Sequence, residues 1–172
     1  MSETNDNDSN NSIALGGQYM SFILGKQTFA IPILTVKEII SLMSITPIPR
    51  IPSDYRGVIN LRGTIIPVVD LRIRFGMDAK PDDNDMGIIV IYLEEETRTI
   101  ELGVIIDDVQ EVLDIAQDDI GPVPEFGESV ETEFLLGLYQ KGEEVISLLD
   151  IEKALSIKEI ENISKINQKT NK

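Results

Sequence analysis

The stretch GVINLRGTIIPVVDLR, residues 57–72, decides the fold of this chain. Two apolar runs rich in β-branched residues flank the dipeptide Arg62-Gly63, which predicts a strand, a tight turn and a second strand. An ionised guanidinium is costly to bury without a partner, so Arg62 should lie at the tip of this hairpin. Asp70 ends the second run and is a residue type that caps helices, so a short helix is expected over residues 71–75.

Arg62 has two interpretations. In the first, its side chain simply extends from the hairpin tip into water. In the second, it anchors a carboxylate of a partner protein, with the apolar residues Ile59, Ile65 and Ile66 around it. Arginine beside apolar surface is typical of a binding hot spot. The spacing of the residues leaves both interpretations open.

The second half of the chain repeats the order of the first. VKEI at 36–39 matches VQEV at 109–112, and GVINLRGTIIPVVDL at 57–71 matches GLYQKGEEVISLLDI at 137–151. This repeat predicts two small all-β units side by side, each with about five short strands. The crossover between the units is expected near residues 77–87, and the N-terminal strand could be shared between the two units.

The spacing inside the repeat is the same in both halves. A glycine precedes an aspartate by thirteen positions in each, Gly57 before Asp70 and Gly137 before Asp150. Lys141 takes the place of Arg62 in the second half. The halves therefore differ at the charged tip, as expected if one half serves a partner that the other does not bind.

Other local patterns predict the remaining elements. Gly25-Lys26 separates two strand-like runs, which indicates another hairpin. Apolar residues in TVKEIISL fall at helical spacing, so one helical turn is expected over residues 36–40. The segment TPIPRIPSDY, 46–55, contains three prolines and is expected to be an extended connector.

Composition excludes several classes of function. The chain has 172 residues, a net charge of −15, and neither histidine nor cysteine. Such an acidic protein repels nucleic acid and anionic membrane surfaces, so neither is expected as a partner. Histidine-based triads, thiol nucleophiles and ordinary zinc sites are excluded as well. Isoleucine, valine and leucine must form most of the core, which suits strands.

No catalytic or metal-binding cluster is predicted. The acidic loop DDNDMG, 82–87, fails the calcium-loop spacing because the fifth and twelfth positions from Asp82 are Met86 and Leu93. Adjacent carboxylates at 107–108 and 118–119 would point to opposite faces of a strand and would not form an acid–base couple. We therefore expect no enzyme activity, no cofactor and no metal.

The two ends of the chain differ from the middle. Residues 1–17 predict a disordered acidic tail without the basic and apolar parts of a signal peptide, so a cytoplasmic location is expected. No apolar run approaches the roughly 18 residues of a membrane span. Residues 157–172 predict a C-terminal helix whose isoleucine stripe packs on the body of the protein or against a partner helix.

Over residues 18–156 the sequence resembles the bacterial chemotaxis coupling proteins, the CheW-like family. The resemblance rests on GVINLRGTIIPVVDLR, FILGKQTFAIPI, VKEI, LGVIIDDVQEVL, PVPEF and LLDIEKAL. The Asn-Leu-Arg-Gly motif before IIPVVDL is specific to this family. The implied fold is all-β with short helices: two SH3-like five-stranded β-barrels side by side, followed by the C-terminal helix.

The resemblance also implies a function without catalysis. Such a protein is an adaptor between the cytoplasmic helical hairpins of chemoreceptors and the regulatory domain of the histidine kinase CheA, itself a CheW-like fold. The adaptor would be cytoplasmic, recruited to membrane-associated receptor arrays and not inserted in the membrane. Head-to-tail contacts, including those with other CheW-like proteins, could close into rings.

Family positions suggest which residues make these contacts. The receptor hairpin would lie in a groove between the barrels, with walls from Ile33, Ile65 and Ile88 and anchors from Glu38 and Arg62. The kinase contacts would come from three further residues: Val36, Gly57 and Phe126.

Two alternatives remain. The same scaffold could serve a non-flagellar chemosensory array that controls motility or gene expression. An enzyme that uses only carboxylates is the other, and the sequence offers no matched pair for it.

Overall fold

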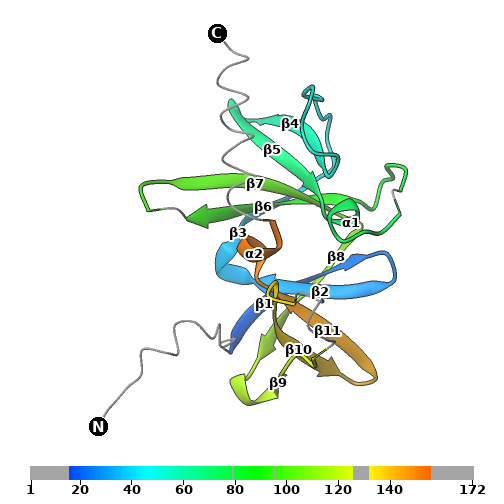
Figure 1. Ribbon diagram of the computed structural model, residues 1–172, viewed down its shortest axis with the longest axis vertical. Helices are drawn as coiled ribbons and strands as arrows, with labels where there is room; N and C mark the ends of the chain where they lie inside the picture. The colour runs from blue at the N-terminus through cyan, green and yellow to red at the C-terminus, as the bar shows by residue number, and fades with distance from the viewer. Residues whose placement is uncertain (1–15, 79, 95, 126–131, 156–172) are drawn as a thin grey trace.

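The computed structural model describes residues 16–78, 80–94, 96–125 and 132–155. Within these residues, eleven strands form two sheets that lie one above the other in Figure 1. The expected all-β fold of two SH3-like subdomains is confirmed. The expected C-terminal helix and nearly all of the N-terminal tail lie outside the described residues, but Gly17 already belongs to the first strand.

The five-stranded sheet has the order β3-β6-β7-β5-β4. Its strands are β3 (Val36–Ser41), β4 (Tyr55–Leu61), β5 (Thr64–Asp70), β6 (Gly87–Glu94) and β7 (Thr99–Ile106). The six-stranded sheet has the order β8-β1-β2-β11-β10-β9. Its strands are β1 (Gly17–Leu24), β2 (Gln27–Pro32), β8 (Asp108–Ile115), β9 (Ile120–Gly121), β10 (Leu135–Lys141) and β11 (Glu144–Leu149).

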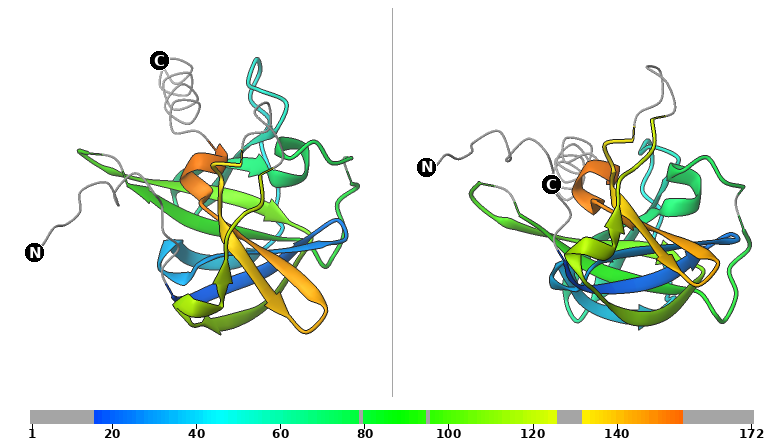
Figure 2. Two further views of the ribbon diagram at one scale, coloured as in Figure 1. Left: turned by 60° about the horizontal axis from the view of Figure 1, so that its bottom comes forward. Right: turned by 90° about the horizontal axis from the view of Figure 1, so that it is seen from below.

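The two sheets have the same topology, and each sheet contains one hairpin from the other half of the sequence. The β1–β2 hairpin, from the first half of the sequence, lies among the strands of the second half, and the β6–β7 hairpin lies among those of the first (Figure 2). In each sheet the exchanged hairpin joins its neighbour by a parallel pair, β7 with β5 and β2 with β11. Each sequence half therefore completes the sheet of the other.

Among the described strands, the chain changes sheet at two places. The first is the 3-10 turn η2 (Ile33–Thr35), and the second is Asp107, between β7 and β8. The expected crossover near 77–87 is wrong, because the strands on either side of that segment, β5 and β6, lie in the same sheet.

In the part of the chain that the structure describes, three hydrophobic clusters stabilise the two sheets. Each sheet curls around its own core, and a third, larger core lies between the sheets. Strand β6 contributes to two of them: Ile88 and Val90 face the core of the five-stranded sheet, whereas Ile89 and Ile91 face the shared core. A strand buried on both faces has no alternation of polar and apolar residues, which explains the continuous apolar run GIIVIYL.

Two short helices follow the two repeated hairpins. Helix α1 (Leu71–Arg74) begins at Asp70, whose carboxylate accepts a hydrogen bond of 3.0 Å from the Arg72 amide, so the predicted cap is confirmed. Helix α2 (Ile151–Leu155) follows Asp150 in the same way. The two hairpins also begin alike: the amides of Asp70 and Asp150 donate to the carbonyls of Asp54 and Phe134, at 2.7 and 2.8 Å.

The helical turn expected over 36–40 is wrong. Residues 36–41 form β3, and their exposure alternates along the strand, as expected for period-two packing. Ile39 and Ile40 pair with β6 opposite Ile89 and Ile88. The β-branched residues of this segment fit a pleated surface, and pairing with β6 outweighs the helical spacing.

Candidate interaction surface

Arg62 lies at the tip of the β4–β5 hairpin in an unfavourable backbone conformation. Its φ is +52° and that of Gly63 is +90°, the pattern of a two-residue type I′ turn. The Asn60 side chain accepts a 2.8 Å hydrogen bond from the Gly63 amide and closes the turn. Asparagine or glycine would adopt this φ easily, whereas an arginine there costs about 1 kcal/mol. The arginine at this turn therefore carries a local backbone cost.

Arg62 pairs with Glu38, the other expected anchor. Its guanidinium donates to the Glu38 carboxylate across the gap between β4 and β3, which are the two edges of the five-stranded sheet. The arginine side chain remains 66% exposed and the glutamate 25%. The pair joins the edges of the barrel, and its exposed guanidinium still has room for a carboxylate from outside.

Exposed aliphatic side chains flank the strands of this ion pair. Ile65, three residues after Arg62, is 54% exposed, and Ile39, directly after Glu38, is 38% exposed. Ile33 is half-buried in η2, immediately before β3. Next to it, Leu34 is 91% exposed, the highest value among the exposed large apolar side chains of the described residues. Sequence reasoning missed Leu34, because no periodic pattern distinguishes it from a core residue.

Ile88 does not belong to this surface. Its side chain is 0% exposed and packs in the core of the five-stranded sheet with Ile59, Ile66 and Val90. The expectation that Ile88 lines a groove wall does not fit the structure, because a residue without exposed area cannot touch a partner while the barrel stays folded. Its position supports the strands that carry the surface.

The three residues expected at the kinase contact have different surroundings. Val36 is half-buried and packs against the shared core. Gly57 is buried with φ +136°, and a Cβ at this position would lie 2.0 Å from the Thr46 carbonyl oxygen. This close approach permits the paired hydrogen bonds between Thr46 and Val58, at 2.8 and 2.9 Å. Phe126 lies outside the described residues.

Lys141 does not occupy the register of Arg62. In the second hairpin Lys141 pairs with Glu144 as the last residue of β10, and the turn begins at Gly142, with φ +63°. Gly142 is therefore the counterpart of Arg62, and Leu61 is the counterpart of Lys141. The expected match was one residue off, since aligning the two basic residues ignores the turn.

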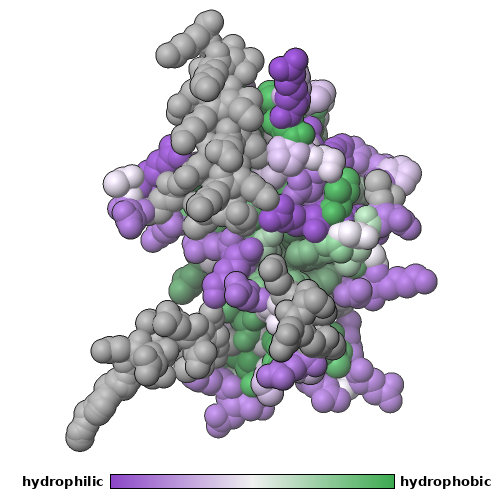
Figure 3. Space-filling model, in the orientation of Figure 1, coloured by the Kyte–Doolittle hydropathy of each residue, from purple (hydrophilic) through white to green (hydrophobic). Residues whose placement is uncertain are grey.

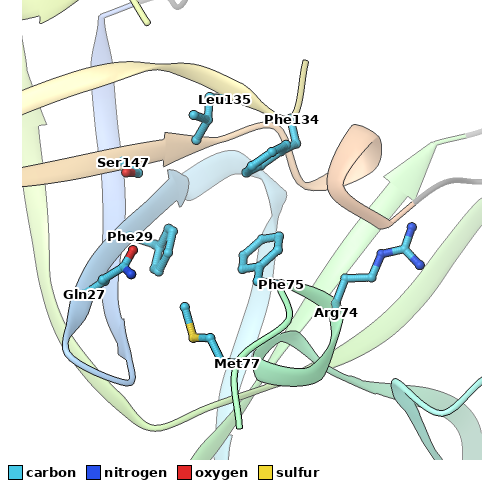
Figure 4. A pocket seen from close by; sticks show the side chains of 8 residues that line it. All are labelled: Gln27, Phe29, Arg74, Phe75, Met77, Phe134, Leu135 and Ser147. Atoms are coloured by element: carbon cyan, nitrogen blue, oxygen red, sulfur yellow. The ribbon is translucent and has the colours of Figure 1, made fainter. Parts of the chain in front are cut away.

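A separate apolar pocket opens between β2, the segment after α1, and the start of β10 (Figure 4). Its volume is about 420 Å³, and three aromatic rings line it: Phe29, Phe75 and Phe134. The centroid of the Phe75 ring is 5.6 Å from that of Phe29 and 5.4 Å from that of Phe134. The Phe75 ring therefore contacts both of the other rings, and all three belong to or pack against the shared core.

The described residues contain no cluster of three or more acidic side chains arranged to hold a metal ion. Among the same residues, no helix is long and apolar enough to cross a membrane. Figure 3 shows apolar surface where the two sheets meet, between the polar surfaces of the two barrels. The described surface thus offers ion pairs such as Arg62–Glu38 and apolar area for contact.

Comparison with known proteins identifies the fold family. Residues 18–159 match the CheW-like domain family. The chain belongs to the CheW-like family. It is 36% identical over 154 residues to the chemotaxis protein CheW of Klebsiella aerogenes, covering 88% of this chain and 90% of that protein. The CheW protein of Treponema pallidum is 32% identical over 152 residues, which cover 87% of this chain and 88% of the relative.

Structural comparison agrees with the sequence match. The crystal structure of the scaffolding protein TtCheW from Thermoanaerobacter tengcongensis has a TM-score of 0.71 and 31% identity, covering 83% of this chain and 94% of that one. The CheW-like resemblance and the prediction of a chemotaxis coupling adaptor are therefore confirmed. The CheW-like family and the similarity to a scaffolding protein thus support a coupling role in chemotaxis.

Proposed function

We propose that this chain is a non-catalytic adaptor that couples chemoreceptor signalling tips to the regulatory domain of the histidine kinase CheA. The similarity to chemotaxis CheW proteins and to a scaffolding protein supports this role. Ion pairing and apolar contact, the chemistry of the described surface, suit protein recognition. We expect the adaptor to be cytoplasmic and to join membrane-associated arrays through its receptor partner.

The receptor surface that we propose is centred on the Arg62–Glu38 pair. A receptor tip is a helical hairpin, and helices that bind in grooves use apolar side chains with a few polar anchors. Ile33, Leu34 and Ile65 supply exposed apolar area on or beside the strands that carry the pair. A carboxylate of the receptor would share or replace Glu38 at the guanidinium. Ile88 is not part of this proposal.

The observation that carries the proposal is that Arg62 combines a positive φ with a 66% exposed side chain, which pairs with Glu38 beside the exposed Ile65. The exposed ion pair with Glu38 contributes roughly 0–1 kcal/mol, no more than the backbone cost of the conformation. Stability alone therefore does not explain an arginine at this turn, whereas binding does. Arginine also suits the role because its planar fork can grip a carboxylate with two nitrogen atoms.

For the kinase contact we propose Val36 and Phe126 as side-chain contacts. Gly57 acts differently, because its lack of a Cβ lets the backbone of β4 approach Thr46. A contact between one barrel of this adaptor and the opposite barrel of the kinase domain is heterologous, so rings are possible.

Binding measurements with isolated partners test the proposal. A soluble receptor-tip fragment and the CheA regulatory domain are titrated separately against the full chain and the variant Arg62→Asn. Asparagine suits the turn, so folding is kept, and receptor affinity should fall at least about tenfold, as for loss of a hot-spot residue. Kinase-domain affinity should stay unchanged.

Arg50 provides a matched control. It is also an exposed arginine with positive φ, at +64°, but it lies in the proline-rich connector. Arg50→Asn should bind both partners normally. Unchanged receptor binding by Arg62→Asn, or an equal loss in the Arg50→Asn control, would refute the proposed anchor.

A non-flagellar array is a second candidate for the same scaffold. The chain is 31% identical over 140 residues to Protein FrzA of Myxococcus xanthus, with 80% of this chain and 84% of that protein covered. Co-purification from the native cell, followed by identification of the bound receptors, separates the candidates. Receptors of a flagellar system support the first, and receptors of another chemosensory system support the second.

A further inference from the structure

The six-stranded sheet contains a second ion pair that repeats Arg62–Glu38. Glu111 is the third residue of VQEV, as Glu38 is the third residue of VKEI. The Lys141 ammonium donates to the Glu111 carboxylate, joining edge strand β8 to the tip of the β10–β11 hairpin. Although Lys141 is one position before the counterpart of Arg62, its long side chain reaches the equivalent glutamate.

The aliphatic residues around the two ion pairs correspond as well. Val112 follows Glu111 and is 46% exposed, as Ile39 follows Glu38. Val145 is 53% exposed and pairs with Gln140 in its hairpin, as Ile65, 54% exposed, pairs with Asn60. Both barrels therefore combine a basic hairpin residue, a glutamate on the edge strand and two exposed aliphatic side chains.

Fold stability does not explain the presence of this second set of residues in the six-stranded barrel. Both members of the Lys141–Glu111 pair are about half exposed, at 46% and 54%, and exposed ion pairs of this kind contribute little to stability. Val112 and Val145 remain about half exposed, so burial of their side chains stabilises the fold only a little. A surface whose residues contribute little to the fold is available for binding.

We propose that this face of the six-stranded barrel is a second binding surface for a receptor-type helical hairpin. The inference rests on the proposed function, since it assigns the same ligand to the repeated set of residues. The occupant needs apolar side chains for Val112 and Val145 and a carboxylate that replaces Glu111 at Lys141. A second copy of this chain fits less well, because two chains of net charge −15 repel each other.

The second surface should bind more weakly than the first. Lysine is a compact, strongly hydrated charge and cannot grip a carboxylate with two nitrogen atoms as arginine does. Valines also offer less apolar area than isoleucines. One adaptor would then hold one receptor tip firmly and a second tip loosely, linking neighbouring receptors.

Titration with a soluble receptor-tip fragment, in calorimetry and sedimentation, tests the inference. The wild-type chain should bind a second fragment weakly, and Arg62→Asn should keep only this weak binding. In the Arg62→Asn background, Lys141→Ala should weaken the remaining binding roughly tenfold. The nearly isosteric Val145→Thr should weaken it by a smaller factor. Lys26→Ala, at the exposed turn of the β1–β2 hairpin in the same sheet, is the control and should change nothing.

The outcomes separate the two proposals. If Arg62→Asn abolishes every trace of fragment binding, the second surface is refuted and the first stands. If Lys141→Ala leaves the weak binding intact, or instead alters kinase-domain binding or self-association, the second surface is also refuted. If the wild-type chain binds no fragment at all, the proposed function itself fails.

Discussion

The Asp107 carboxylate accepts hydrogen bonds from two nitrogen atoms of the Arg72 guanidinium, where the chain passes from one sheet to the other. The Nε–Oδ1 distance is 2.8 Å, and the Gly25 amide donates to Oδ2 at 2.7 Å. The Asp107 amide in turn donates to the Ile23 carbonyl at 3.0 Å. The pair thus ties α1 to the β1–β2 hairpin, which belongs to the opposite sheet.

Asp107→Asn should destabilise the fold in a pH-dependent manner. Burial opposes ionisation of this carboxyl, but hydrogen bonds from Arg72 and the Gly25 amide outweigh burial and lower the pKa of Asp107 below its ordinary value. Because the folded pKa is lowered, the carboxylate stabilises the fold above the unfolded pKa of about 4, and this contribution is lost as pH falls through the folded pKa.

At pH 7 the variant should lose roughly 3 kcal/mol of unfolding free energy, since it breaks a mostly buried pair. The difference from wild type should shrink steadily below about pH 4. Urea unfolding of both chains across this range measures it. A difference that stays constant from pH 7 to pH 2.5 would contradict the assigned role of the carboxylate.

Gly57→Ala should unfold the β4 region. The new methyl would overlap the Thr46 carbonyl, and alanine would also be strained at φ +136°, so a loss of at least about 2 kcal/mol is expected. Gly76 is the matched control: it has φ +75° and no atom within 4 Å of an added Cβ, so Gly76→Ala should cost only about 1 kcal/mol. Thermal unfolding compares the two. Equal losses would show that steric contact with Thr46 is unimportant.

Ile88→Ala should mainly reduce stability, whereas Ile65→Ala should mainly reduce receptor binding. Ile88 is fully buried, so its truncation should cost about 3 kcal/mol and alter receptor binding only through the loss of folded protein. Ile65 is 54% exposed, so its truncation should leave stability nearly unchanged and weaken receptor binding. Receptor binding measured well below the melting temperature of both variants separates a binding defect from a loss of folded protein. A specific binding defect in folded Ile88→Ala would restore this residue to the receptor surface.

Arg62→Asn should not destabilise the protein. Asparagine removes the strain at φ +52°, and the exposed pair with Glu38 contributes little, so the unfolding free energy should stay constant or rise by up to about 1 kcal/mol. Chemical denaturation measures this alongside the binding assay. A loss above 2 kcal/mol would mean that the Arg62–Glu38 closure is a structural requirement of the barrel.

Local signals in the sequence predicted local structure well. The two strand-turn-strand hairpins, the tip position of Arg62 and the cap at Asp70 each depend on residues within about fifteen positions of one another. The helical turn over 36–40 failed because its apolar spacing suits a strand equally well, and only pairing with β6 decides between them.

The candidate surface was harder to predict. Glu38 and Arg62 were expected as separate anchors, and only the folded barrel brings them together as a pair. Ile88 was expected at a groove wall, but β6 is buried on both faces, so no alternation in its sequence shows where each side chain points. Leu34 carries no local pattern that marks it as exposed.

The sequence by itself determined that this protein consists of two copies of one small β-unit, because local residue patterns specify the repeated strands, turns and caps. Only the tertiary structure decided that each copy completes its barrel with the first hairpin of the other. The reason is physical: β-branched hairpins of similar length can pair with several edges, and the choice depends on long-range packing in the core that the two sheets share.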